Sequence, residues 1–328
     1  MLVLTRADVE ALLDLDALVD GLAGAMADLS AGRASAPDRI AASVPQQHAF
    51  MAAMPAYVPS VGALTCKLVT VFEGNAGGQL PTHQAVVLAF DPRTGEPTAL
   101  VDGTSITALR TAAGSALSAR LLAREDASVA AVLGTGVQAR AHAYAIARVR
   151  SLGELRVAGR NDARARALAS ELSAGLEVEV RACRSWAEAM DGADIVCAAT
   201  HADQPVVRRE WLASGAHVTS VGFNPDGREV DDRTVADALV VVESRGAALA
   251  PFPAGSNDLL EPIREGVIAA EHVHAEIGEL ILGTRPGRES ASQITLYKSV
   301  GVAVQDAVAA SLVLKAARSQ GSGRQISL

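Results

Sequence analysis

Apolar positions along the chain follow first a helical and then a strand-like period. After Thr5, apolar residues recur at spacings of three and four through Leu22, which predicts a helical opening, and Thr5 with Asp8 has the form of a capping box. From about 37 to 102 the runs become continuous or alternating, which predicts strands over 63–72 and 84–91. Turn residues at 91–95 predict a hairpin that ends near 103, and an Ala-rich helix is expected over 105–122.

Beyond residue 122, short strands and helices alternate. This pattern is typical of a doubly wound, mostly parallel sheet in an α/β fold. A long amphipathic helix is predicted over 295–315, and the Ser- and Gly-rich tail after Arg318 is expected to be disordered. The predicted strands cover 129–133, 154–158, 177–181, 194–199, 217–221 and 239–242, and the predicted helices cover 137–150, 162–174 and 185–190.

The turn after the first of these strands is rich in glycine. Gly134, Thr135 and Gly136 lead into Val137 and Gln138, which open a predicted helix. In a dinucleotide-binding turn the first glycine allows the tight bend, and the second lets the backbone approach a pyrophosphate. The N–H groups at the helix start, together with the helix dipole, would then hold the phosphates. The flanking strand and helix therefore favour a nucleotide site over an ordinary turn.

The end of the next strand bears on which nucleotide is bound. A site for NAD usually places an acidic residue there to bind the ribose 2′-hydroxyl, whereas this chain has Arg160 followed by Asn161. A guanidinium pairs well with a 2′-phosphate, so we expect NADPH, with NADH as an open alternative. Asn161 can equally serve as the cap of the following helix.

Composition narrows the classes of partner. The 328 residues are 49% hydrophobic, but only 3% are aromatic, so two domains with Ala-, Val- and Leu-built cores are expected. The net charge of −8 disfavours nucleic acid and anionic membranes. No apolar run is long enough to span a bilayer, and no secretory signal opens the chain. Three separated cysteines and no metal-ligand spacing favour a cytoplasmic protein without a metal site.

Four polar residues stand in apolar or strand-like surroundings: Arg39, Lys67, Arg110 and Asn224. A lysine within a strand is usually solvated, and an arginine in an Ala-rich helix usually lies on the surface. The pattern alone therefore leaves a structural and a functional interpretation open for both Lys67 and Arg110.

The order of these segments resembles the ornithine cyclodeaminase/mu-crystallin family over nearly the whole chain. The resemblance rests on 67–69, 102–103, 107–113, the turn 134–140, 221–231, 276–279 and 295–301. It implies a homodimer whose substrate-binding and dimerisation domain combines 1–118 with 297–328, while 119–296 forms a Rossmann-type domain that binds NAD(P).

The resemblance also implies roles for individual residues. Arg39, Lys67 and Arg110 would surround the α-carboxylate and the reacting nitrogen of an imino or amino acid, with Asn224 as a fourth candidate catalytic residue. Like charge from the two arginines would disfavour the ammonium form of Lys67. His83 is a weaker candidate near the same pocket. The nucleotide would contact Gly134, Thr135, Gly136, Val137, Gln138, Arg160, Asn161, Thr200, Val221 and Gly222.

Two departures from the family's cyclodeaminases point to a particular substrate. Those enzymes carry an acidic residue where this chain has Asn224 and a glutamate where it has Ala52, so the carboxylates that would handle a diamine are missing. We therefore expect NADPH-dependent reduction of the C=N bond in cyclic 2-imino acids, giving L-proline or L-pipecolate. The alternatives are an alanine-dehydrogenase-type or N-alkyl amino acid forming reductive aminase, an ornithine cyclodeaminase, and a non-catalytic mu-crystallin-like protein that binds NADPH or another ligand.

Overall fold

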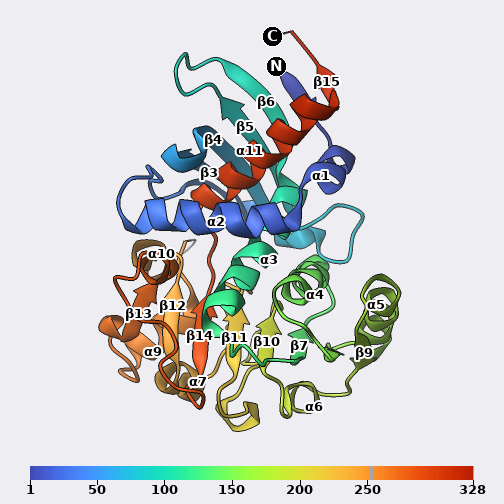
Figure 1. Ribbon diagram of the computed structural model, residues 1–328, viewed down its shortest axis with the longest axis vertical. Coiled ribbons are helices and arrows are strands. Elements are labelled where there is room, and N and C mark those ends of the chain that lie inside the picture. The colour runs from blue at the N-terminus through green and yellow to red at the C-terminus, as the bar shows by residue number, and fades with distance from the viewer. Residues whose placement is uncertain (252–253, 328) are drawn as a thin grey trace. The chain divides into compact units, whose positions relative to one another are not determined.

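The computed structural model describes residues 1–251 and 254–327 and divides into two compact units (Figure 1). The first unit comprises Met1–Arg110 with Gly301–Leu328, and the second comprises Thr111–Val300. One division falls inside α3 (Gly103–Leu122), whereas the sequence placed the boundaries at 118/119 and 296/297. The α/β class with a parallel sheet is confirmed.

The first unit is built on a seven-stranded sheet in the order β15-β1-β6-β5-β4-β3-β2. Its strands pair antiparallel except for β1 and β6, which run parallel. The strands are β1 (Leu2–Leu4), β2 (Ile40–Val44), β3 (Ala49–Val58), β4 (Ala63–Phe72), β5 (His83–Phe90), β6 (Pro97–Asp102) and β15 (Arg324–Gln325).

Helices α1 (Arg6–Leu12), α2 (Leu15–Ser30) and α11 (Ala303–Gln320), with the first part of α3, complete this unit. The predicted helical opening is two helices, α1 and α2, because the backbone becomes extended at Leu13 and Asp14 then caps the second helix. The predicted Thr5–Asp8 capping box is confirmed. The C-terminal helix α11 (Ala303–Gln320) lies against β3, β4 and α2 and is buried along most of its length (Figure 1).

The helix predicted over 295–315 is wrong at its beginning. Thr295–Lys298 form strand β14, which pairs with strands of the second unit's sheet, and α11 starts only at Ala303. Gly301, with φ +75°, separates the two elements. A buried strand of four residues has no period that distinguishes it from a helical turn, and its pairing partners are distant in sequence.

The tail predicted to be disordered is also wrong. After Gly321 ends α11 in a left-handed conformation, β15 pairs antiparallel with β1, and the amino group of Met1 donates to the carbonyl of Ile326. The tail has few apolar side chains, so its order depends on backbone hydrogen bonds offered by the edge strand.

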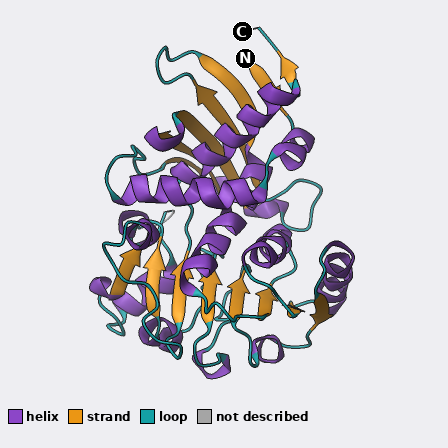
Figure 2. Ribbon diagram, in the orientation of Figure 1, coloured by secondary structure: helices purple, strands orange, loops and turns teal. Residues whose placement is uncertain are grey.

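The second unit contains an eight-stranded sheet in the order β13-β12-β14-β11-β10-β7-β8-β9, and all of its pairs are parallel (Figure 2). Its strands besides β14 are β7 (Val129–Leu133), β8 (Glu154–Ala158), β9 (Glu179–Ala182), β10 (Ile195–Ala198), β11 (His217–Ser220), β12 (Leu239–Val242) and β13 (Val273–Glu276). Its helices besides α3 are α4 (Val137–Val149), α5 (Asp162–Gly175), α6 (Trp186–Met190), α7 (Asp232–Asp237), α8 (Arg245–Ala248), α9 (Asn257–Arg264) and α10 (Ile277–Ile281).

Both faces of this sheet carry an apolar core. On β7, Ala130 and Val132 pack toward α3, α4 and α5, whereas Ala131 and Leu133 pack into the cluster on the other face. A parallel strand covered on both sides needs apolar residues at successive positions, which explains the continuous run in its sequence.

The sheet reverses its order at β7. From this strand the chain moves to β8 and β9 on one side and later to β10 and β11 on the other. In open α/β sheets such a switch point, at the carboxyl ends of the strands, is where ligands bind. The glycine-rich turn after Leu133 lies at this point.

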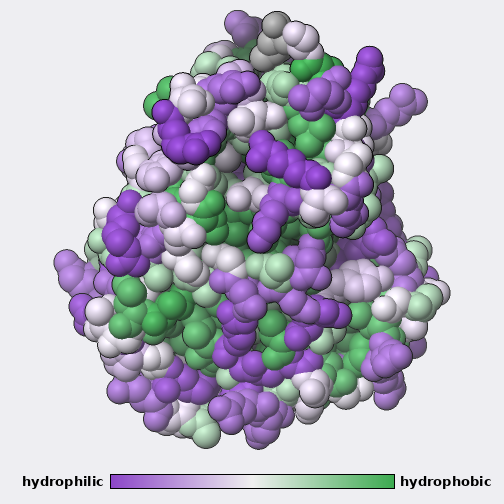
Figure 3. Space-filling model, turned by 45° about the horizontal axis from the view of Figure 1, so that its top comes forward, coloured by the Kyte–Doolittle hydropathy of each residue, from purple (hydrophilic) through white to green (hydrophobic). Residues whose placement is uncertain are grey.

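Within the described ranges, no helix is long and apolar enough to cross a membrane. The face of the molecule in Figure 3 mixes hydrophilic and hydrophobic side chains. Cys66, Cys183 and Cys197 are free thiols.

Candidate active site

Lys67 lies on the buried face of β4, in the middle of the first unit's sheet. The strand alternates buried and half-buried residues, and Lys67 falls on the buried side with 2% of its surface exposed. Its neighbour across the ladder is Met54 of β3. The common expectation of a solvated strand lysine therefore does not hold here.

A carboxylate on another element, not predicted from the sequence, accounts for this burial. Asp306, on the first turn of α11, places Oδ2 2.7 Å from Lys67 Nζ and Oδ1 3.0 Å from Arg110 Nε. Asp306 is 1% exposed and Arg110 is 5% exposed. Two cations thus share one anion in a buried cluster, and removing one partner from such a cluster is costly.

Gln305 and Gly301 fix the guanidinium of Arg110. Gln305 Oε1 accepts from Arg110 Nη1 at 2.8 Å, and a Cβ at Gly301 would come within 2.5 Å of the same nitrogen. A guanidinium has five N–H donors, and Asp306 and Gln305 use two of them. The arrangement leaves donors that could bind a ligand carboxylate.

Burial dominates the protonation of Lys67. It lowers the pKa of Lys67 to about 8, while the Asp306 charge opposes this change and the Arg110 charge adds to it. The expected repulsion from arginines is therefore real but is not the largest cause. Burial alone would raise the pKa of Asp306, but the charges of Lys67 and Arg110 outweigh it and hold that pKa below its ordinary value.

Arg39 and His83 belong to the same unit. Arg39 Nη2 donates to the carbonyl of Gly301 at 2.7 Å, which places Arg39 beside the segment that carries Asp306. His83 opens β5, and burial, together with the charges of Lys67 and Arg110, lowers its pKa to about 4. The imidazole is therefore neutral at physiological pH.

The nucleotide turn in the second unit has the geometry that its sequence predicts. Gly134 has φ +124°, and a Cβ there would come within 2.4 Å of the carbonyl of Ala199, so only glycine fits. A Cβ at Gly136 would meet nothing within 4 Å. Gly136 caps α4 without a side-chain hydrogen bond, which leaves the first helical N–H groups for an anion. These features fit a dinucleotide pyrophosphate.

Val137, Thr135 and Gln138 line the start of the same helix. Val137 is 64% exposed at the first helical position. Thr135 packs against Gly159 at the end of β8, where a Cβ on Gly159 would come within 2.5 Å of the Thr135 methyl group. The two glycine-containing turns therefore lie in contact.

Arg160 and Asn161 follow β8 and are both exposed. The side-chain oxygen of Asn161 accepts from the Arg164 N–H at 3.0 Å and so caps α5. The capping interpretation of Asn161 is therefore confirmed.

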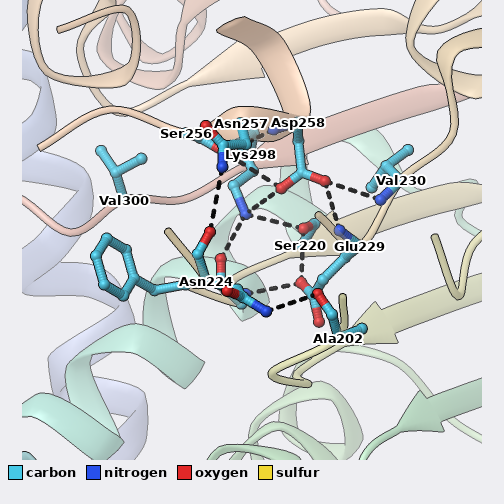
Figure 4. A network of polar contacts seen from close by, with 12 residues as sticks. Ala202, Ser220, Asn224, Glu229, Val230, Ser256, Asn257, Asp258, Lys298 and Val300 are labelled. Carbon is cyan, nitrogen blue, oxygen red and sulfur yellow. Dashed lines mark hydrogen bonds and ion pairs between the residues drawn. The ribbon is translucent and has the colours of Figure 1, made fainter. Parts of the chain in front are cut away.

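A buried carboxylate joins the ends of two neighbouring strands (Figure 4). Glu229 Oε1 accepts from the N–H and the hydroxyl of Thr200, which follows β10, at 2.6 and 2.7 Å. Its Oε2 accepts from Ser220 Oγ and the Gly222 N–H, both at 2.7 Å. A Cβ at Gly222 would lie 2.3 Å from this carboxylate, so the loop approaches it only because residue 222 is glycine.

Lys298 at the end of β14 completes this network. Its Nζ contacts Asp258 Oδ2 at 2.8 Å, Ser220 Oγ at 3.0 Å and the Gly222 carbonyl at 3.0 Å. Asp258 in turn accepts from the backbone N–H groups of Glu229 and Val230 (Figure 4). All three donors of this ammonium are used, so Lys298 holds the loops in place and has none left for a ligand.

Thr200, Val221, Gly222 and Asn224 line one pocket of the second unit, together with Ser299 and Val300. The Asn224 Nδ2 donates to the Ala202 carbonyl and to Asp203, and its Oδ1 accepts from the Asp226 N–H. This side chain therefore fixes the loop at the pocket wall.

The structure thus sorts the predicted residues into two groups. Arg39, Lys67 and Arg110 come together in the first unit, and Asn224 lies with the predicted nucleotide residues in the second. Asp306 and Gln305 were not predicted from the sequence because both lie in a stretch that has the pattern of an apolar helix. A carboxylate inside such a helix was the one available signal. Among the described residues, no group of three or more metal-ligating side chains occurs.

Comparisons with known proteins agree with this geometry. The model of the ornithine cyclodeaminase/mu-crystallin family matches residues 1–321. The ketimine reductase mu-crystallin of Mus musculus is 39% identical over 300 residues, which cover 90% of each chain.

Two solved structures resemble the whole chain. One is the Thermococcus litoralis Δ1-pyrroline-2-carboxylate reductase in complex with NADH and L-proline, with a TM-score of 0.95 and 38% identity over 99% of this chain and 100% of the other. The second is an archaeal alanine dehydrogenase dimer with bound NAD, with a TM-score of 0.92 and 31% identity over 100% and 99% of the two chains. The glycine-rich turn, the buried lysine with its arginines and these full-length matches lead to one conclusion: the chain belongs to the ornithine cyclodeaminase/mu-crystallin family.

Proposed function

We propose that this protein is an NADPH-dependent reductase of the C=N bond in cyclic 2-imino acids, yielding L-proline or L-pipecolate. The observation that carries the proposal is the buried cluster of Lys67, Arg110 and Asp306, which joins a proton donor to a carboxylate-binding cation. The names of the relatives support it, because they include a ketimine reductase and a Δ1-pyrroline-2-carboxylate reductase.

In this proposal the arginines bind and orient the substrate. The remaining N–H groups of Arg110, together with Arg39, would pair with the α-carboxylate of the imino acid. Because Asp306 and Gln305 already fix the guanidinium, little entropy is lost when the substrate binds. The carbon next to the carboxylate is then held in one orientation.

Lys67 would supply the proton. When bound, the reduced nicotinamide supplies a hydride to the imine carbon. Lys67 Nζ gives a proton to the ring nitrogen, so that C=N becomes CH–NH, and solvent later returns the proton to the lysine. Contacts with Asp306 and Thr107 use two of the three ammonium donors, which leaves one to point at the substrate. A pKa of about 8 lies close to the pH at which a general acid works best in cells.

The preference for NADPH rests on Arg160. It is exposed directly after β8, the position from which a dinucleotide's adenosine ribose is usually recognised. The two solved structures contain NADH or NAD, so a pyridine nucleotide is common to both and the 2′-phosphate is the proposed distinction.

The substrate is proposed to have no second amine. Ala52 lies on the same face of the sheet as Lys67 and is 1% exposed, in the position where the family's cyclodeaminases carry a glutamate. Asn224 replaces the second carboxylate and uses its amide on its own loop. A distal ammonium would therefore find no counterion at either position.

We also propose a homodimer formed through the first unit. On the sheet face opposite Lys67, the apolar residues Met51, Tyr57 and Val86 are 45, 38 and 39% exposed. An apolar sheet face of this kind usually binds a partner, and one solved relative is a dimer. The molar mass in solution tests this point, and a value for a single chain would contradict it.

The decisive assay follows NADPH oxidation with Δ1-pyrroline-2-carboxylate and Δ1-piperideine-2-carboxylate, alongside pyruvate with ammonia or methylamine. Fast turnover of a cyclic imine is expected. Activity confined to the oxo acid with an amine would instead favour the alanine-dehydrogenase-type alternative. The similarity to the archaeal alanine dehydrogenase is the observation that supports that alternative. Binding of NADPH without turnover of any of these compounds would favour a ligand-binding protein.

A further inference from the structure

The first turn of α11 brings an anion to a cluster that is otherwise cationic. Lys67 of β4 is faced by Arg110 and Thr107 of α3, by Arg39 from the loop before β2, and by His83 of β5, whose imidazole is neutral. Asp306 is the carboxylate that faces Lys67 among the groups acting on it. Without this carboxylate, the charged groups named here that act on the buried ammonium would all be cations.

The position of Asp306 is determined by its two partners. One carboxylate oxygen contacts Lys67 and the other contacts Arg110, so rotation of the side chain would break one of the two ion pairs. Gln305 strengthens the attachment, because its side-chain oxygen accepts from Arg110 and from the Val302 N–H at the start of the helix. The helix start, the guanidinium and the carboxylate therefore form one rigid unit.

We propose that Asp306 is a positioning residue of the reaction, which holds the Lys67 ammonium in one place and keeps it protonated at neutral pH. The inference rests on the proposed function, since it concerns the step for which Lys67 supplies the proton. It adds a residue that touches neither the substrate nor the nucleotide and acts through Lys67.

The direction of the effect follows from the charges. Burial and Arg110 lower the pKa of Lys67, and the Asp306 carboxylate raises it. An opposite charge within about 4–6 Å typically shifts a pKa by about 1–3 units. In Asp306→Asn the pKa of Lys67 should therefore be lower than in wild type by about one unit or more.

The chain is well suited to a direct test because it has three lysines, Lys67, Lys298 and Lys315. Labelling with lysine carrying ¹³C at the ε carbon gives one NMR signal for each, and their chemical shifts can be followed against pH in wild type and Asp306→Asn. Lys315 is exposed and serves as an internal reference, and Lys315→Arg assigns its signal. The measurement needs neither nucleotide nor turnover.

Asp28→Asn is the matched control. Asp28 is a buried carboxylate of the same unit, but it accepts from Arg33 and from the Ser60 N–H. This variant should leave the Lys67 titration where it is in wild type. A lowered Lys67 titration in Asp306→Asn but not in Asp28→Asn supports the proposal, and equal titrations in wild type and Asp306→Asn overturn it.

Asp306→Glu separates charge from position and covers the case in which Asp306→Asn does not fold. It keeps the anion but displaces it by one methylene. We expect the Lys67 titration to stay near the wild-type value, while kcat for the cyclic imine falls at least tenfold and KM for NADPH stays constant. Wild-type kcat in this variant would overturn the positioning role.

The kinetic profile is the second readout. In Asp306→Asn the alkaline limb of kcat against pH should move to lower pH by the same amount as the NMR titration. If wild type reduces no cyclic imine, the proposed function fails, yet the NMR titrations still decide whether Asp306 holds the proton on Lys67. Failure of the inference and failure of the function are therefore distinguishable.

Discussion

Two buried lysines in this protein have different surroundings and therefore different uses. Lys298 gives all three of its donors to Ser220, Gly222 and Asp258. Lys67 gives two donors to Asp306 and Thr107, and its pKa is lowered to about 8. Lys67 therefore keeps one donor that Lys298 does not have, and its own proton leaves near physiological pH. Burial alone does not separate the two lysines, whereas the number of donors already in use favours Lys67 as the proposed proton donor.

Replacing Lys67 by Met should separate binding from chemistry. The substitution keeps the volume of the side chain but removes the proton donor, so kcat should fall about 10²- to 10⁴-fold. The Kd for NADPH, measured by fluorescence titration, should stay near the wild-type value because the nucleotide residues lie in the other unit. Lys315→Met, at an exposed position, is the control. Parallel loss of nucleotide binding and turnover would count against the role of Lys67.

Arg160 should set the choice of nucleotide. In Arg160→Asp a 2′-phosphate would meet a carboxylate in place of a guanidinium. Charge-assisted hydrogen bonds contribute about 1.5–3 kcal/mol, so the ratio of kcat/KM for NADPH over NADH should fall about 10- to 100-fold. Arg166→Asp, one turn along α5, makes the same change in net charge at a distance and should shift the ratio far less. An unchanged ratio in Arg160→Asp would remove the basis for preferring NADPH.

Helices and strands could be predicted from the sequence where neighbouring residues gave a clear signal. Strands β4 and β8 begin and end where their apolar patterns predicted, and the capping box of Thr5 and the turn at Gly134 were predicted from neighbouring residues. β14 and β15 were missed because both are stabilised by pairing with strands far away in sequence. Local patterns contain no information about such pairing.

In the candidate site, too, contiguous residues could be predicted from the sequence, whereas residues distant in sequence could not. Its nucleotide turn was predictable because all of its residues are contiguous. The cluster around Lys67 was only half predictable, since Asp306 lies 196 positions from Arg110 in sequence. The pattern of α11 identifies a helix but does not specify which buried cation its carboxylate would meet.

Two glycines of the turn between β7 and α4 should respond differently to alanine. Gly134→Ala places a Cβ against the Ala199 carbonyl at positive φ, and such strain should lower the free energy of unfolding by about 1–3 kcal/mol. Gly136→Ala meets no protein atom and loses only the preference for glycine over alanine at an N-cap, so it should lower stability by less than Gly134→Ala does. It should nevertheless weaken NADPH binding, because the methyl group occupies the approach of the pyrophosphate. Denaturant unfolding and NADPH titration of both variants check this contrast.

At the scale of the molecule, buried histidines should make stability depend on pH. Burial lowers the pKa of His142 to about 4 and that of His217 to about 3, well below the ordinary value of 6.5. Between these lowered pKa values and the ordinary value of 6.5, the unfolded chain therefore binds more protons than the folded chain. The contribution of these histidines to the free energy of unfolding should be fully present above pH 6.5. It should fall on acidification, by up to about 1.4 kcal/mol per pH unit for each histidine.

The contacts of His142 explain the cost of protonation. Its Nδ1 donates to the carbonyl of Gln138, so Nε2 accepts from Ser115, and a second ring proton would break that bond. Urea unfolding between pH 4 and 7 tests the effect. In His142→Gln the decline with acidification should be shallower, whereas the exposed His201→Gln should match wild type. An identical slope in all three proteins would contradict this origin.

The late position of Asp306 in the sequence also affects how the protein is made. A ribosome that has released the first 300 residues has delivered Lys67 and Arg110 but not the carboxylate that neutralises them. Two cations without their anion are costly to bury. We therefore expect the N-terminal sheet to close over this cluster only after α11 has been synthesised. The second unit has all of its strands by residue 298 and should be able to fold first, so we expect its nucleotide-binding turn to form before the cluster around Lys67 is assembled.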